Sequence, residues 1–191
     1  MIKDLSIIRI AGCGNIGSFL SYFIILRSLR DESFSELHLY DSDLLHEPNL
    51  PYLFLNENEA SKYMRNPKVI ALGFQLCNIK PPHLSIIVHA NNYPEEKLSG
   101  FCIDCRDTNE HQETFNVKLC QDGNYGRIIW NPKKEIELKH SRYELGRSSF
   151  NAILFVSDFC KMIFCNPDYN ENLNNNQIII NYGRGGTKFY V

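Results

Sequence analysis

The sequence predicts an α/β fold, in which a Rossmann-like, doubly wound and mostly parallel sheet ends in antiparallel C-terminal strands. Three observations lead to this prediction. The apolar run 7–11 leads directly into Gly12, Gly14 and Gly17, and a second apolar run follows them. Strand-like runs then alternate with helix-like segments as far as residue 105. Near the end of the chain, two strand-like runs enclose the glycine-rich residues 183–186 and predict a hairpin.

The glycine turn organises the predicted fold. In a strand–turn–helix unit the first glycine permits the tight turn, the second lets the backbone approach a phosphate, and the third lets the helix pack against the strand. The helix expected over 18–29 offers its N-terminal N–H groups and the positive end of its dipole to an anion. We therefore assign Gly12, Gly14, Asn15 and Gly17 to a nucleotide-binding turn. A doubly wound domain that has this turn and binds no ligand is the alternative.

The first half of the chain continues as alternating strands and helices. The strand at 37–40 ends at an acidic residue, and the loop that follows contains prolines and few periodic apolar residues. Since proline is tolerated in the first turn of a helix, Pro67 predicts a helix over 68–77. The β-branched run 84–88 predicts a third strand, and 100–105 a fourth.

The second half is predicted to be mixed. Phe115 and Leu119 lie one helical turn apart, which favours a helix over 108–120. Strands are expected in four short runs and a buried helix in one long apolar run: strands at 128–130, 135–138, 177–182 and 187–191, and the helix at 148–164. The sequence contains no repeats and no second-domain boundary, so residues 1–191 are expected to form a single nucleotide-binding domain.

Composition narrows the class of protein. The chain has 191 residues, 43% of them hydrophobic, and a net charge of −2, which gives no reason to expect a nucleic-acid partner. The apolar run 19–29 is too short to span a membrane and is interrupted by Ser21 and Arg27. The first predicted strand lies almost at the start of this sequence, so we expect no signal peptide. We therefore expect a soluble, cytoplasmic protein that contacts no membrane.

The cysteines and histidines do not form a metal site in the sequence. Four of the seven cysteines lie in apolar stretches and are expected to be buried thiols: Cys13, Cys77, Cys160 and Cys165. The single C-x-x-C, Cys102 and Cys105, lacks the second pair that a structural zinc site normally has. The six histidines lack metal-ligand spacing. We interpret Cys120 as a core thiol at a helix end rather than a thioester nucleophile, because no activating group lies nearby in the sequence.

Polar motifs follow the predicted strands in a recognisable order. After the glycine turn come four short segments: Asp41-Ser-Asp43, Glu47-Pro-Asn49-Leu50, Asn66-Pro67-Lys68 and Asp104-Cys-Arg-Asp107-Thr108. This order resembles the ThiF/MoeB and ubiquitin-activating-enzyme adenylation family. The run 121–129 is similar to the glycine-punctuated strand pair of that family, and 148–164 to its late buried helix. The resemblance therefore covers nearly the whole chain.

The resemblance implies ATP and magnesium as cofactors and adenylation of a carboxylate as the chemistry. It implies that Asp41 holds the ribose, that Asp43, Asn49 and Lys68 line the phosphate side, and that Asp107 holds the magnesium ion. Lys68 and Asp107 would then be the catalytic residues. The acceptor in such proteins is often the C-terminus of a ubiquitin-like or sulfur-carrier protein, and the resemblance also implies a homodimer or heterodimer.

The physical chemistry of these residues agrees with that reading. Asp41 ends its strand about 25 residues beyond the glycine turn, near the spacing expected for ribose contact. Asp43 and Asp107 follow the carboxyl ends of strands, where ligands bind in open α/β sheets. A lysine can neutralise triphosphate charge, and a carboxylate can bind magnesium. The alternatives remain open: Asp41 as a strand cap, Asn49 in a local turn, and Asp43 and Lys68 as solvated residues.

One departure from the family bears on catalysis. Tyr52 stands where the family has a phosphate-binding arginine, and tyrosine cannot supply a positive charge or a bidentate fork. Thr108 replaces an asparagine of the family motif. We therefore weigh three functions: an ATP-dependent adenylyltransferase, a catalytically inactive nucleotide-binding or scaffold subunit of the same fold, and an NAD(P)-dependent oxidoreductase that uses Asp41 on the ribose.

Overall fold

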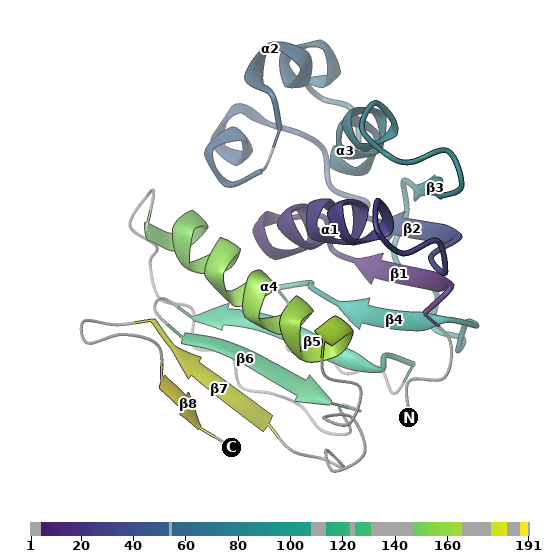
Figure 1. Ribbon diagram of the computed structural model, residues 1–191. Helices are drawn as coiled ribbons and strands as arrows, with labels where there is room; N and C mark the ends of the chain where they lie inside the picture. The colour runs from purple at the N-terminus through teal and green to yellow at the C-terminus, as the bar shows by residue number, and fades with distance from the viewer. Residues whose placement is uncertain are drawn as a thin grey trace.

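Strand β1 (Ile7–Ala11) lies inside the parallel part of the sheet, between β2 (Glu36–Tyr40) and β4 (Phe101–Asp104), as Figure 1 shows. The computed structural model describes residues 5–53, 55–107, 114–122, 125–130, 147–165, 177–182 and 188–190. Within them the sheet has eight strands in the order β3-β2-β1-β4-β5-β6-β7-β8. The other strands are β3 (Ser85–His89), β5 (Val117–Asp122), β6 (Tyr125–Trp130), β7 (Gln177–Asn181) and β8 (Lys188–Tyr190).

The direction of strand pairing changes at β5. Strands β3, β2, β1, β4 and β5 pair in parallel, whereas β5, β6, β7 and β8 pair antiparallel. The predicted mostly parallel sheet with antiparallel C-terminal strands is therefore confirmed, and so is the C-terminal strand pair.

Helices α1 (Asn15–Ser28), α3 (Lys68–Cys77) and α4 (Arg147–Cys165) cover one face of the sheet, with α1 between the other two (Figure 1). The predicted helix 68–77 is confirmed at both ends, and the predicted helix 148–164 agrees with α4 to within one residue at each end. Between β2 and α3 lie three short elements: η1 (Glu47–Tyr52), α2 (Glu57–Ala60) and η2 (Ser61–Tyr63).

The main core forms between this helical layer and the sheet. Because side chains alternate along a strand, β1 turns Ile8 and Ile10 toward the helices and Arg9 toward the other face. Phe155 and Phe159 of α4 are fully buried in the same cluster.

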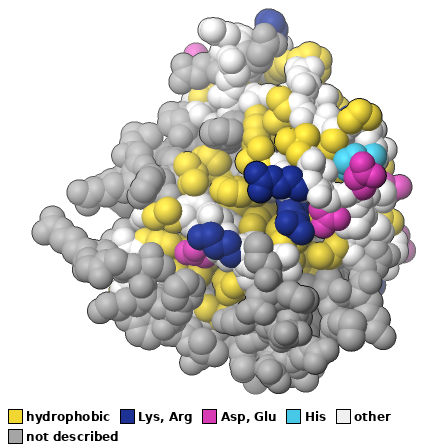
Figure 2. All heavy atoms as spheres, in the orientation of Figure 1, with side chains coloured by type: hydrophobic (Ala, Val, Ile, Leu, Met, Phe, Trp, Pro, Cys, Tyr) yellow, Lys and Arg dark blue, Asp and Glu magenta, His cyan; other side chains and the backbone are white. Residues whose placement is uncertain are grey.

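On the face of the molecule drawn in Figure 2, the described basic side chains form small groups, several beside acidic ones. None of the helices in the described ranges is both long and apolar enough to cross a membrane.

The helix predicted over 108–120 is wrong throughout its described part: residues 114–116 are not helical, and the chain forms β5 from residue 117 onward. Val117 and Leu119 belong to the main core, whereas Phe115 packs in a separate cluster with Tyr40 and Tyr93. The period of the segment is therefore that of a strand, and pairing with β4 and β6 satisfies its backbone. Residues 108–113 lie outside the described residues.

Two smaller predictions also change, and two others concern residues that the structure does not describe. Helix α1 begins at Asn15, three residues before its predicted start, so the second half of the glycine motif is already helical. Cys77 is exposed at the end of α3, so its predicted burial is wrong, whereas Cys13 and Cys160 are buried as expected. The predicted strand over 135–138 and the side chain of Cys165 lie outside what the structure describes.

Candidate functional site

A cavity of about 810 Å³ opens at the carboxyl ends of β1, β2 and β4. Strand order reverses direction at β1, because β2 and β3 lie on one side of it and β4 and β5 on the other. Open α/β sheets bind ligands at such a switch point. One side of the cavity is lined by the glycine turn with Asp41, Asp43 and Lys68, and another by residues that follow β4 and by residues of β5.

The glycine turn has the close approaches that its sequence predicts. Gly12 has a φ of +88°, in the left-handed region that favours glycine. A Cβ on Gly17 would lie 1.9 Å from the carbonyl oxygen of Gly12, so the start of α1 sits directly on the turn. Gly14, Asn15 and Ile16 line the cavity, which puts the N-terminal backbone of α1 against whatever binds there.

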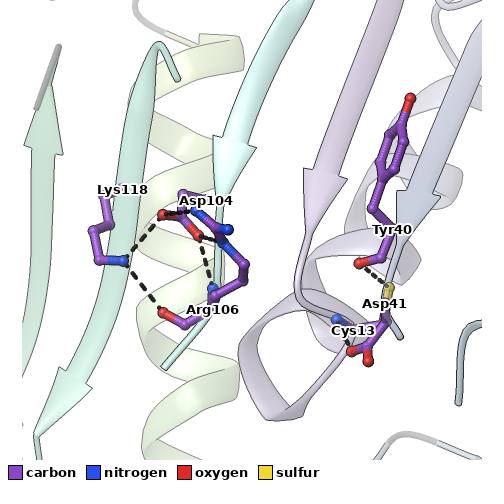
Figure 3. Close-up of polar contacts among 6 residues, drawn as sticks. All are labelled: Cys13, Tyr40, Asp41, Asp104, Arg106 and Lys118. Atoms are coloured by element: carbon purple, nitrogen blue, oxygen red, sulfur yellow. Dashed lines mark hydrogen bonds and ion pairs between the residues drawn. The ribbon is translucent and has the colours of Figure 1, made fainter. Parts of the chain in front are cut away.

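Asp41 ties the end of β2 to the glycine turn (Figure 3). Its Oδ2 atom accepts a hydrogen bond from the backbone N–H of Cys13 at 2.7 Å, which Figure 3 shows. Its Oδ1 atom accepts one from the N–H of Asp43 at 2.8 Å. Burial raises the pKa of the Asp41 carboxyl, an effect that the nearby Lys68 ammonium opposes. The side chain is thus both a structural cap and a preoriented carboxylate in the cavity wall.

Lys68 stands at the first position of α3 and reaches back to the same carboxylates. Its Nζ atom lies 2.8 Å from Oδ2 of Asp43 and 3.7 Å from Oδ2 of Asp41. Only 11% of the side chain is exposed. The backbone N–H of Lys68 also donates to the carbonyl oxygen of Asp43 at 2.8 Å. Two carboxylates and one ammonium give this cluster a formal charge of −1.

A second charged cluster lies beside the cavity, at the end of β4 and on β5, and the sequence did not reveal it (Figure 3). Asp104 accepts hydrogen bonds from Nε and Nη2 of Arg106 at 2.9 and 3.1 Å, and from Nζ of Lys118 at 3.0 Å. Asp104 and Lys118 are nearly inaccessible, at 2% and 1% side-chain exposure, whereas Arg106 is 21% exposed and lines the cavity. One carboxylate and two cations give this cluster a formal charge of +1.

The segment Asp104–Thr108 predicts a site residue at Asp107 and gives no local signal for Arg106. The helix predicted over 108–120 hides the role of Lys118, which lies on β5. The alternation Val117-Lys118-Leu119-Cys120 is typical of a strand, and that signal would have put Lys118 on the face opposite the main core.

The remaining predicted site residues take different positions. Asp107 is exposed and lines the cavity. Gly17 lies behind the turn, against Gly12. Asn49 lies in η1, where its Oδ1 atom accepts a hydrogen bond from the N–H of His46 at 2.9 Å, so it closes a local turn. Tyr52 ends η1, but its side chain lies outside what the structure describes. Among the described residues, no three histidine, cysteine or acidic side chains are grouped to hold a metal ion.

Cys120 also lines the cavity, from β5 rather than from a helix end. Burial raises the pKa of its thiol to about 11, with the charge of Lys118 opposing this. A thiol with that pKa is protonated at neutral pH and is a weak nucleophile. The interpretation of Cys120 as a buried core thiol is therefore retained, on a strand.

The chain is similar to known proteins in its three-dimensional structure. No protein-family model matches the chain, and no curated protein matches it. Among solved structures, E. coli MccB with ATP aligns with a TM-score of 0.64 and 17% identity over 97% of this chain and 63% of that chain. The microcin C7 biosynthetic enzyme MccB with N-formylated MccA gives 0.65 and 16%, over 97% and 64%. Selenomethionine PaaA gives 0.64 and 13%, over 97% and 64%.

These structures establish the fold of the chain. The resemblance inferred from motif order is confirmed at the level of the fold, which the chain shares with MccB and PaaA. The chain spans less than two thirds of the length of these matched structures.

Proposed function

We propose that this chain binds ATP in the cavity at the glycine turn and transfers the adenylyl group to a carboxylate. The observation that supports this most is the convergence of the glycine turn, Asp41, Lys68 and Asp107 on one cavity. Its volume of about 810 Å³ is in the range of small-molecule sites. MccB, which has the same fold, has been crystallised with ATP and with AMPCPP.

The residues fit a nucleoside triphosphate in a definite orientation. Asp41 would accept hydrogen bonds from the ribose, since two backbone amides already fix its carboxylate. Gly12 and Gly14 would let the turn approach the phosphates, and Lys68 would neutralise part of their charge. Asp107 would hold magnesium, which proteins usually bind through one or two carboxylates together with substrate phosphates and water.

The proposed reaction is a displacement at the α-phosphorus. An oxygen of the acceptor carboxylate forms a bond to that phosphorus, and the bond from the phosphorus to the pyrophosphate oxygen breaks. Such chemistry needs positioning and charge neutralisation more than covalent participation by the protein. The acceptor class that the family resemblance implies is the C-terminus of a small carrier protein; MccB has been crystallised with MccA.

Isothermal calorimetry with ATP and magnesium, followed by ATP–pyrophosphate exchange with candidate carriers, tests the proposal. Heat of binding together with acceptor-dependent exchange is the expected result. Thermal stabilisation by a nicotinamide dinucleotide but not by ATP would contradict the proposal and favour an oxidoreductase.

A binding subunit without catalysis is the second candidate. Two observations favour it: Lys68 is already engaged by Asp43 at 2.8 Å, and Tyr52 replaces the expected arginine. ATP binding without exchange for any acceptor tested would support this candidate.

Replacement of Asp107 by alanine should lower the rate of magnesium-dependent exchange by about 100-fold or more, because a ligand to the charge-neutralising ion is lost. The side chain is exposed, so we expect the melting temperature to stay unchanged. Glu32→Ala, at another exposed carboxylate, is the charge-matched control and should leave the rate unchanged. An Asp107→Ala variant with the wild-type rate would remove Asp107 from the site.

A further inference from the structure

Two charged clusters of opposite formal charge lie at the cavity, and Arg106 is the member of the second that lines it. The cluster of Asp41, Asp43 and Lys68 carries a formal charge of −1, whereas Asp104, Arg106 and Lys118 together carry +1. Asp43 is 72% exposed, and the two other carboxylates that line the cavity, Asp107 and Glu95, are also exposed, so solvent screens all three. The less exposed charges balance at Asp41 and Lys68 and leave one excess positive charge at the cluster of Arg106, where an anionic group of a ligand is favoured.

Arg106 is the part of the positive cluster that a ligand can reach. Lys118 and Asp104 lie deeper and are nearly inaccessible, while Arg106 is 21% exposed. The backbone N–H of Arg106 also donates to Oδ1 of Asp104 at 3.0 Å, so the residue is held by both its main chain and its side chain. The guanidinium carbon lies 5.0 Å from the ring centre of Phe115, which fixes the plane of the group.

The main chain at Arg106 lies directly against the glycine turn. A Cβ on Gly12 would be 2.8 Å from the backbone nitrogen of Arg106, and the N–H of Cys105 donates to the carbonyl oxygen of Ala11 at 2.7 Å. Arg106 and the first residues of α1 therefore line the same cavity.

We infer that Arg106 is a second phosphate-binding cation of this site, beside Lys68, and that buried Asp104 and Lys118 hold it in place. This inference rests on the proposed function. It assigns to Arg106 the phosphate contact that the family's arginine would make, at the position that Tyr52 occupies in this chain. Arginine suits the role because its planar fork matches phosphate oxygens and it stays charged. The ligand is then a nucleotide with its phosphates toward Arg106 and its ribose toward Asp41.

Calorimetric titration of the full chain with ATP and, separately, with adenosine tests the inference. Arg106→Gln should weaken ATP binding by about 10- to 100-fold, the equivalent of one charge-assisted hydrogen-bond pair. Adenosine affinity should not change, because adenosine has no phosphate. Arg106→Lys keeps the charge but loses the fork, so its ATP affinity should fall between the two. Arg30→Gln, at an exposed arginine beyond the C-terminal end of α1, is the matched control.

The outcomes separate this inference from the proposed function. Equal loss of ATP and adenosine affinity in Arg106→Gln would mean a structural role only, and unchanged ATP affinity would mean no role; either overturns the inference and leaves nucleotide binding intact. Failure of the wild-type chain to bind ATP overturns both.

A measurement on the wild-type chain covers the case in which Arg106→Gln does not fold. Phenylglyoxal modifies accessible arginines, and peptide mass spectrometry locates the modified residue. Saturating ATP should slow modification of Arg106, while adenosine and Arg30 serve as the ligand and residue controls. Equal modification of Arg106 with and without ATP would overturn the inference.

Discussion

Replacement of Asp104 by asparagine should destabilise the protein by about 3–5 kcal/mol, the range for removing one partner from a buried ion pair. The carboxylate is 2% exposed and is the acceptor for both Arg106 and Lys118. Asparagine keeps the size of the side chain but removes its negative charge, so the ammonium of Lys118 stays buried without a carboxylate partner. Urea unfolding followed by circular dichroism measures the loss.

Lys118→Met provides the control for this prediction, because methionine fills a similar volume without a charge. In the wild-type background it should destabilise the protein, since Asp104 loses one of its two cations. In the Asp104→Asn background it should raise stability, because it removes the unbalanced charge. If Lys118→Met changed the free energy of unfolding equally in both backgrounds, the electrostatic account would be contradicted, and packing alone would explain the effect.

This ion cluster also marks the limit of what the sequence could predict. Local sequence patterns predict the glycine turn, Asp41 and Lys68, because these lie at a turn, at the end of a strand and at the start of a helix. Asp104 and Lys118 meet because the parallel register of β4 and β5 sets them opposite each other. That register depends on where the chain returns to the sheet after residue 107, which no local pattern specifies.

The one large error in secondary structure has the same origin. Phe115 and Leu119 have helical spacing, but they pack in different hydrophobic clusters. Pairing of β5 with both β4 and β6 decides the segment, and such pairing is a tertiary effect that local propensity does not contain. Asn49 is the opposite case, because its position in a local turn depends only on neighbouring residues. The turn that the sequence allows as the alternative role of Asn49 is present in the structure.

Replacement of Gly17 by alanine should disrupt the turn and abolish nucleotide binding. In most helices this change would be favourable by about 1 kcal/mol because alanine is the better helix former. Here the added Cβ would lie 1.9 Å from the carbonyl oxygen of Gly12, which is backbone and cannot rotate away. Either α1 or the turn must move, so we expect a net loss of stability of about 1–3 kcal/mol, as for other overpacked sites. Thermal unfolding and ATP calorimetry measure the two effects.

Gly14→Ala is the matched control, since it makes the same chemical change two positions from Gly12 in the same turn. A Cβ there would meet no atom within 4 Å, and φ at Gly14 is −77°, which alanine tolerates. Its stability should therefore stay within about 1 kcal/mol of wild type. Because Gly14 lines the cavity, the methyl group should still weaken ATP binding by keeping phosphates away from the backbone. A stable Gly14→Ala variant with full ATP affinity would place the phosphates elsewhere in the cavity, whereas a stable Gly17→Ala variant would show that α1 is less constrained than its contacts indicate.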